Sequence, residues 1–150
     1  MKSQIRIFLT YLSPKGSKNS NELDKLGSWI YNHIDKEITT LIVGDFNFTG
    51  AKWIADSFTT GSQCSNDFIE IFKTCNFTQL VTNPTRGNSI LDLVFVNPEE
   101  SIHSILVGPP LNNMCDHNSV SMAVNQKNIK NKLDKKTISG LSKSRLWKYK

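Results

Sequence analysis

The alternation of apolar and polar residues predicts a series of short β-strands along the chain. In residues 4–11 the side chains alternate with a period of two. A strand here would have one face formed by Ile5, Ile7, Leu9 and Tyr11. Residues 38–43 are instead continuously apolar or β-branched, as in a strand that is covered on both faces. Further apolar segments predict strands at residues 90–96, 102–107 and 119–124.

Two segments with helical spacing lie between these strands. The first follows Asn19-Ser20-Asn21-Glu22, a sequence typical of a helix-capping box, and its apolar residues are Leu23, Leu26, Ile30 and Ile34. The second begins after Ser65 or Asn66, either of which can cap it, and its apolar residues are Phe68, Ile69, Phe72 and Cys75.

The length and composition fit one domain. With 150 residues, of which 38% are hydrophobic, the chain can bury a core, and none of its apolar runs approaches the length of a membrane span. The N-terminal sequence MKSQIRIFLTYLSPKG lacks the cleavage site of a signal peptide, so we expect an intracellular protein, nuclear or cytoplasmic. Cys64, Cys75 and Cys115 form no Cys-x-x-Cys pair, which favours reduced thiols over disulfides or structural zinc.

Positive charge is concentrated at the C-terminal end. Residues 1–125 contain 9 Lys and Arg against 12 Asp and Glu, a net charge of −3, whereas residues 126–150 contain 9 against 1, a net charge of +8. Because the second segment has few apolar residues, we expect a folded domain over residues 1–125 and a flexible basic tail over residues 126–150. A polyanion is a natural partner for this tail, although many basic tails only raise solubility.

Polar residues stand where apolar strands end. Asp45 and Asn47 directly follow the continuous apolar strand, and ligands of open α/β sheets bind at the carboxyl ends of strands. Asp92 lies among apolar neighbours in the strand ILDLVFV, so its carboxylate needs a partner. Two further polar sites are Asp116 with His117, in the loop before the last strand, and Tyr11, at the end of the first.

Together these residues indicate phosphodiester hydrolysis. Each alone is weak evidence, because single histidines, Asp-His pairs in loops and tyrosines at strand ends are common in proteins without this activity. The reaction needs acids that hold Mg²⁺ and position water, donors for the phosphoryl oxygens, and a base held by a carboxylate. The set contains all three kinds of group.

Several short motifs occur in one order between residues 4 and 125. They are Tyr11-x-x-Pro14, Gly44-Asp45-Phe46-Asn47 with Trp53 shortly after, Asn83-Pro84-Thr85-Arg86-Gly87, Ile90-Leu91-Asp92-Leu93-Val94, and Pro110-Leu111 leading to Asp116-His117-Asn118. In this order they resemble the C-terminal two thirds of an endonuclease/exonuclease/phosphatase (DNase I-like) domain, in the branch carried by non-LTR, LINE-type retrotransposons. The resemblance implies an α/β fold, a partial four-layer α/β sandwich that contains mainly the C-terminal sheet with flanking helices.

The resemblance implies a catalytic role for five residues. Asp45 would orient and deprotonate the attacking water, and Asn47 would bind the phosphate or that water. Asp92 would accept a hydrogen bond from the imidazole of His117, which contacts the scissile phosphate. Tyr11 would donate a hydrogen bond to the phosphate.

Three more residues are expected around this centre. Ser89 matches a position whose hydroxyl braces the site in the family, and Asp116 would bind Mg²⁺ or Mn²⁺ or tune its neighbours. Arg86 would contact the backbone of DNA, or it is an exposed loop charge with no such role.

Parts of the family pattern are missing. The family places a metal-binding glutamate and a phosphate-contacting asparagine on strands that precede the one at residue 4, so we expect weakened binding of the metal. Cys115 stands where the family commonly has a serine. An incomplete sandwich would also expose an apolar sheet face, which predicts self-association.

Three functions are open at this point. The first is a metal-dependent phosphodiesterase, the incomplete DNA endonuclease domain of a retrotransposon. The second is a catalytically inactive relic that binds nucleic acid through its basic tail. The third is hydrolysis of another phosphoester, such as an inositol phosphate or a sphingolipid, but Pro-Thr-Arg-Gly and Ile-Leu-Asp-Leu-Val-Phe fit the retroelement branch better.

Overall fold

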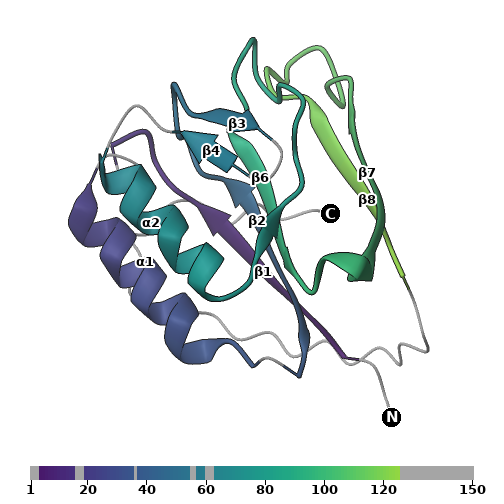
Figure 1. Ribbon diagram of the computed structural model, residues 1–150. Coiled ribbons are helices and arrows are strands. Elements are labelled where there is room, and N and C mark those ends of the chain that lie inside the picture. The colour runs from purple at the N-terminus through teal and green to yellow at the C-terminus, as the bar shows by residue number, and fades with distance from the viewer. Residues whose placement is uncertain (1–3, 16–18, 36, 55–56, 60–62, 126–150) are drawn as a thin grey trace.

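A mixed β-sheet with two helices on one face and a β-hairpin on the other forms the described part of the chain (Figure 1). The computed structural model describes residues 4–15, 19–35, 37–54, 57–59 and 63–125. The predicted basic tail, residues 126–150, lies outside these described residues. No helix within them is long and apolar enough to cross a membrane.

The helices and strands follow one another in an α/β order. In sequence they are β1 (Ile5–Tyr11), α1 (Ser20–His33), β2 (Thr39–Asp45), β3 (Lys52–Ile54), β4 (Ser57–Thr59), α2 (Gln63–Thr74), β5 (Thr78–Gln79), β6 (Asp92–Asn97), a 3₁₀-helix (Glu99–Ser101), β7 (Ile102–Gly108) and β8 (Ser119–Val124). The main sheet has the strand order β1-β2-β6-β5, with β1 parallel to β2 and the other neighbours antiparallel. The pairs β3-β4 and β7-β8 form two small antiparallel sheets.

Helices α1 and α2 cover one face of the main sheet. The side chain of Asn19 caps α1 by accepting a hydrogen bond from the N–H of Asn21, as the capping sequence predicts. Phe8 of β1 packs edge-on against Trp29 of α1, with ring centroids 4.9 Å apart. Because strand side chains alternate between faces, the helices cover the Phe8 side of β1, not the side of Ile7 and Leu9.

An aromatic cluster fills the space between the sheet and α2. The rings of Phe72 in α2 and Phe95 in β6 stack with centroids 3.9 Å apart, and Phe46 packs against both. Phe46 is fully buried, and its N–H donates to the carbonyl of Leu91. This explains the apolar residue between two polar ones in Asp45-Phe46-Asn47: the chain turns out of β2 while Phe46 stays in the core.

The hairpin of β7 and β8 covers the other face of the sheet only in part. Its inward side chains, which pack against the core, are Ile105, Val107, Val120 and Met122. They lie over β2 and β6 and leave β1 bare, so that Ile7 is 59%, Leu9 85% and Tyr11 57% exposed. The exposed apolar face that the resemblance predicts is therefore present, and it lies on β1.

Several element boundaries differ from those predicted. β2 continues to Asp45, because its ladder with β6 extends to the pair Asp45 and Asp92. α2 begins at Gln63, so Ser65 and Asn66 lie in its first turn and do not precede it. β6 begins at Asp92, two residues after the predicted start. The strands β3, β4 and β5 were not predicted, since segments of two or three residues are too short to show a period.

Candidate active site

Three predicted site residues lie side by side across neighbouring strands. Tyr11 is the register partner of Asp45, and Asp45 is the partner of Asp92, so their side chains share the face on which the hairpin lies. Gly44 permits this close pairing, because a Cβ at this position would lie 1.7 Å from the carbonyl oxygen of Thr10. The close approach of β1 to β2 therefore explains why a glycine precedes Asp45.

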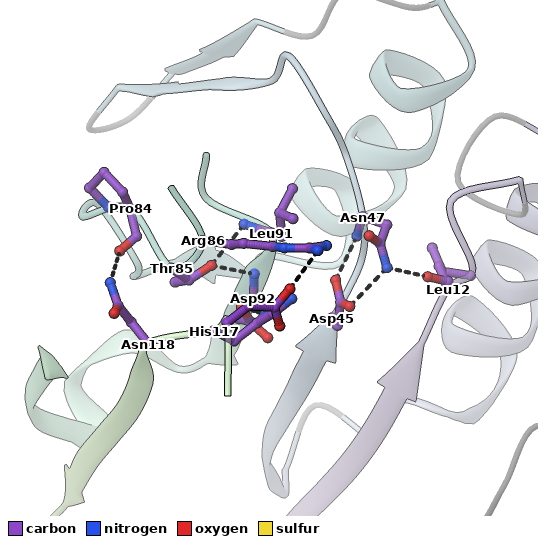
Figure 2. A network of polar contacts seen from close by, with 11 residues as sticks. Leu12, Asp45, Asn47, Pro84, Thr85, Arg86, Leu91, Asp92, His117 and Asn118 are labelled. Carbon is purple, nitrogen blue, oxygen red and sulfur yellow. Dashed lines mark hydrogen bonds and ion pairs between the residues drawn. The ribbon is translucent and has the colours of Figure 1, made fainter. Parts of the chain in front are cut away.

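Asn47 holds the carboxylate of Asp45 (Figure 2). Its backbone N–H donates to Oδ1 of Asp45 at 3.0 Å, and its side-chain Nδ2 donates to Oδ2 at 2.8 Å. Nδ2 also donates to the carbonyl of Leu12 at 2.8 Å, and the residue is 4% exposed with a φ of 50°, a conformation that asparagine tolerates. Both amide hydrogens are used inside the protein, so Asn47 positions Asp45, and its predicted contact with phosphate or water stays a prediction.

The carboxyl group of Asp45 has a raised pKa. Burial is the largest cause, and the charge of Asp92 raises the pKa further, while the hydrogen bonds from Asn47 and the charge of His117 lower it. A carboxylate with a raised pKa is a better proton acceptor than an ordinary aspartate. The geometry and the pKa therefore suit Asp45 to the role of a general base.

This raised pKa predicts a pH-dependent loss of stability. The folded chain binds the Asp45 proton more tightly than the unfolded chain does, so this contribution to stability is present below the ordinary pKa of 3.8 and is lost as the pH rises through the raised value. We expect the free energy of unfolding of the wild type to fall relative to that of Asp45→Asn over this pH range. Urea unfolding of both proteins at a series of pH values measures the difference, and parallel profiles would contradict the prediction.

His117 and Asp92 form the contact that the resemblance implies. Nδ1 of His117 lies 2.7 Å from Oδ2 of Asp92, and both side chains are 26% exposed. When Nδ1 carries the proton and donates to the carboxylate, Nε2 is left to exchange a proton with a substrate. Asp92 also neighbours Asp45 in the sheet, so the dyad and the candidate base share one end of the sheet.

Thr85 holds the backbone of Asp92 and of the residue after His117, and the sequence predicts no role for it. It is fully buried, and its Oγ1 accepts hydrogen bonds from the N–H groups of Leu91 and Asp92, each at 3.0 Å. Its carbonyl accepts from the N–H of Asn118 at 2.7 Å, directly after His117. One side chain and one carbonyl thus tie the strand of the aspartate to the loop of the histidine, and Figure 2 shows the two bonds of the side chain.

An ion pair joins the two loops that border the site. Nη2 of Arg86 lies 2.5 Å from Oδ2 of Asp116, and the side chains are 49% and 67% exposed. In Figure 2 the Arg86 side chain extends from its loop toward Asp45 and Asn47. Asn118 adds a second link between the loops, since its Nδ2 donates to the carbonyl of Pro84 at 3.0 Å.

The predicted brace at Ser89 is made by the backbone. Its carbonyl accepts from the N–H groups of Thr85 and Arg86, and its own N–H donates to the carbonyl of Arg86. These bonds close the tight turn that carries Arg86. The predicted role of the Ser89 hydroxyl stays a prediction.

The aspartates do not form a preformed metal site. Among the described residues, no three His, Cys, Asp or Glu side chains are grouped so that they could hold a metal ion. Asp45, Asp92 and Asp116 instead accept hydrogen bonds or an ion pair from protein groups. The described residues therefore hold no preformed group of three ligands, and the expectation that Asp116 binds Mg²⁺ or Mn²⁺ stays a prediction.

Comparison with protein families gives one result for this chain. A family model described as endonuclease-reverse transcriptase matches residues 5–121, which include the whole sheet, the hairpin through Ser121 and each of the predicted site residues. No curated protein matches the chain.

Proposed function

Because the chain belongs to the endonuclease-reverse transcriptase family, we propose that this site hydrolyses phosphodiester bonds of DNA. The observation that supports the proposal most is the 2.7 Å contact between His117 and Asp92, at the sheet end where Asp45 lies. The family match also favours DNA over the inositol phosphates and sphingolipids considered from the sequence.

In the proposed reaction, each residue acts through the contacts described above. Asp45, oriented by Asn47, accepts a proton as the water oxygen attacks phosphorus. His117, oriented by Asp92 through Nδ1, presents Nε2 to the phosphate. The bond from phosphorus to the leaving oxygen breaks, and that oxygen takes up a proton from solvent water. Tyr11 lies beside Asp45 in the register and would donate its hydroxyl proton to a phosphate oxygen.

A nicking assay on supercoiled plasmid tests the proposal. The wild-type chain should convert supercoiled DNA to the open circle, and Asp45→Ala should lose this activity. Asp24→Ala is the matched control, because Asp24 is an exposed aspartate on α1. Equal nicking by the wild type and Asp45→Ala would assign the activity to a contaminant and refute the proposal.

A requirement for Mg²⁺ or Mn²⁺, which the resemblance implies, is part of this proposal. Since no group of three ligands is preformed, we expect the free ion to bind weakly. Nicking should stop in EDTA and return when Mg²⁺ is added in excess. Undiminished nicking in EDTA would remove the metal from the proposal and leave the roles of Asp45 and His117 to be tested separately.

Arg86 is proposed to bind a phosphate of the DNA backbone. Its partner Asp116 is largely exposed, so a phosphate can compete for the guanidinium at small cost. We predict that Arg86→Gln weakens DNA binding and lowers the slope of log K against log salt by about 1. Fluorescence anisotropy with a labelled duplex over a series of salt concentrations measures this slope.

Lys73→Gln is the matched control for this substitution. Lys73 is also 49% exposed and paired with an acid, Glu70, but it lies on α2. Its replacement should leave the salt slope unchanged. If Arg86→Gln and Lys73→Gln change binding equally, Arg86 has no specific contact with the phosphate.

A second candidate function is nucleic-acid binding without catalysis. The observation that favours it is the net charge of +8 in residues 126–150. On this alternative, deletion of residues 126–150 abolishes salt-dependent DNA binding, and the intact chain does not nick plasmid. Retention of binding after the deletion would refute the tail as the binding element.

A further inference from the structure

Arg86 and Asp116 belong to two loops whose backbones are held by other contacts. The loop before β6 and the loop between β7 and β8 lie side by side at one end of the main sheet (Figure 1). Backbone bonds with Ser89 close the turn of Arg86, and Asn118 joins the two loops through its backbone N–H and its side chain. Because none of these bonds uses the charged side chains, the ion pair of Arg86 and Asp116 can open by a movement of side chains alone.

This ion pair is a contact between two exposed groups. The side chain of Arg86 is 49% exposed and that of Asp116 is 67% exposed. Water therefore competes with the contact, and an exposed pair of this kind closes with an equilibrium constant of only about 1–5. The closed and the open states of the pair are then both populated in the free protein.

The carboxylate of Asp116 is chemically similar to the group that Arg86 is proposed to bind. A carboxylate and a phosphodiester are both anions that present two oxygens to a guanidinium. A phosphate on the same guanidinium would lie close to the carboxylate, and two like charges at such a separation repel each other. Binding of DNA at Arg86 and the ion pair with Asp116 therefore oppose each other.

We propose that Asp116 is an internal competitor of DNA: its carboxylate occupies Arg86 in the free protein, and a backbone phosphate binds there only after the carboxylate is released. This competition rests on the proposed function, because it requires that Arg86 contacts DNA. The affinity for DNA is reduced by the fraction of molecules in which the pair is open, which for an exposed pair is a factor of about two to six. By linkage, bound DNA frees the carboxylate of Asp116, directly before His117 in the chain.

An ion pair with a purely structural role would have the opposite effect on binding. If the pair held the two loops in place for DNA, its loss would loosen them and weaken binding. If Asp116 is a competitor, its loss frees Arg86 and tightens binding. The direction of the change in affinity therefore separates the two roles.

DNA binding by Asp116→Asn in EDTA tests the competition. Asparagine has nearly the same shape without the charge, and EDTA removes any effect of Asp116 on a metal ion. Fluorescence anisotropy with a labelled duplex should show binding about two- to sixfold tighter than that of the wild type. Glu70→Gln is the matched control and should leave the affinity unchanged, because Glu70 is 65% exposed and paired with Lys73 on α2. Unchanged or weaker binding by Asp116→Asn, or equal tightening by Glu70→Gln, would overturn the proposal.

The same substitution in an Arg86→Gln background separates competition from long-range repulsion. Without the guanidinium, loss of the Asp116 charge relieves only its repulsion of DNA, which salt screens. The tightening should therefore be much smaller than in the wild type, and equal tightening in both backgrounds would overturn the proposal. If Arg86→Gln alone leaves DNA binding unchanged, the contact of Arg86 with DNA and the competition fail together.

Carbon NMR of the Asp116 carboxyl group reports its release directly. Duplex DNA added in EDTA should move this signal toward its position in free Arg86→Gln, where the pair cannot form. A signal that stays in place while anisotropy shows bound DNA would overturn the proposal. Neither measurement involves cleavage, so a failure of the chain to nick plasmid would refute the proposed hydrolysis and leave the competition standing.

Discussion

Replacing His117 with alanine is expected to lower the rate of plasmid nicking by roughly 10²–10⁴-fold, the range of effects of a positioned proton-transfer group. The imidazole is held by Asp92 at 2.7 Å, and the side chain is only partly buried. Its removal should leave the loop in place, because Asn118 keeps its bonds to Pro84 and Thr85. Single-turnover nicking under excess protein measures the loss.

His103→Ala is the control for this substitution. His103 is an exposed histidine in β7, so its loss should leave the nicking rate unchanged. Asp92→Asn should slow nicking as well, because it replaces the carboxylate that accepts the Nδ1 hydrogen bond and orients the ring of His117. If His117→Ala nicks at the wild-type rate while its circular dichroism spectrum is unchanged, the proposed role of the dyad is wrong.

The sequence predicts the parts of the fold that have a long repeated pattern. β1, α1 and the hairpin strands extend over six to fourteen residues, and their apolar spacing places each of them within a residue or two of its observed position. The pattern does not say which face of β1 is covered. Ile7 and Leu9 form the more apolar face of β1, but this face is exposed because the hairpin does not extend over β1. The covered face is that of Phe8, which packs against α1.

The candidate site was predictable as a set of residues but only partly as a set of contacts. The carboxylate of Asp92 among apolar neighbours requires a partner, and the structure supplies His117. The ion pair between Arg86 and Asp116 was not predicted, because it depends on how two surface loops meet. Neither local propensity nor periodicity contains that information.

Thr85 shows the limit most clearly. It belongs to the turn-rich motif Asn83-Pro84-Thr85-Arg86-Gly87, where a threonine is ordinarily an exposed loop residue. Its complete burial and its two bonds to the start of β6 arise only in the folded chain. One signal was available in the sequence. Thr85 precedes a strand that begins with Asp92, and a loop hydroxyl in such a place can accept hydrogen bonds from N–H groups that the strand leaves unpaired.

Thr85→Val is therefore expected to cause a large loss of stability. Valine has nearly the same shape, so no cavity forms, but the N–H groups of Leu91 and Asp92 lose their acceptor. Each buried donor left unpaired costs about 1–3 kcal/mol, which for two donors is a large fraction of the stability of an ordinary domain. Urea unfolding followed by circular dichroism measures the change in the free energy of unfolding.

The same substitution should also disturb the dyad, because Thr85 locates both Asp92 and the residue after His117. Nitrogen NMR of His117 reports which ring nitrogen carries the proton, and we expect Thr85→Val to weaken the preference for Nδ1. Thr85→Ser retains the oxygen and should restore both the preference and most of the stability. Thr74→Val, at an exposed threonine of α2, should change the stability by less than about 0.5 kcal/mol. If Thr85→Ser is as unstable as Thr85→Val, the methyl group and its packing, and not the two hydrogen bonds, are what the site requires of Thr85.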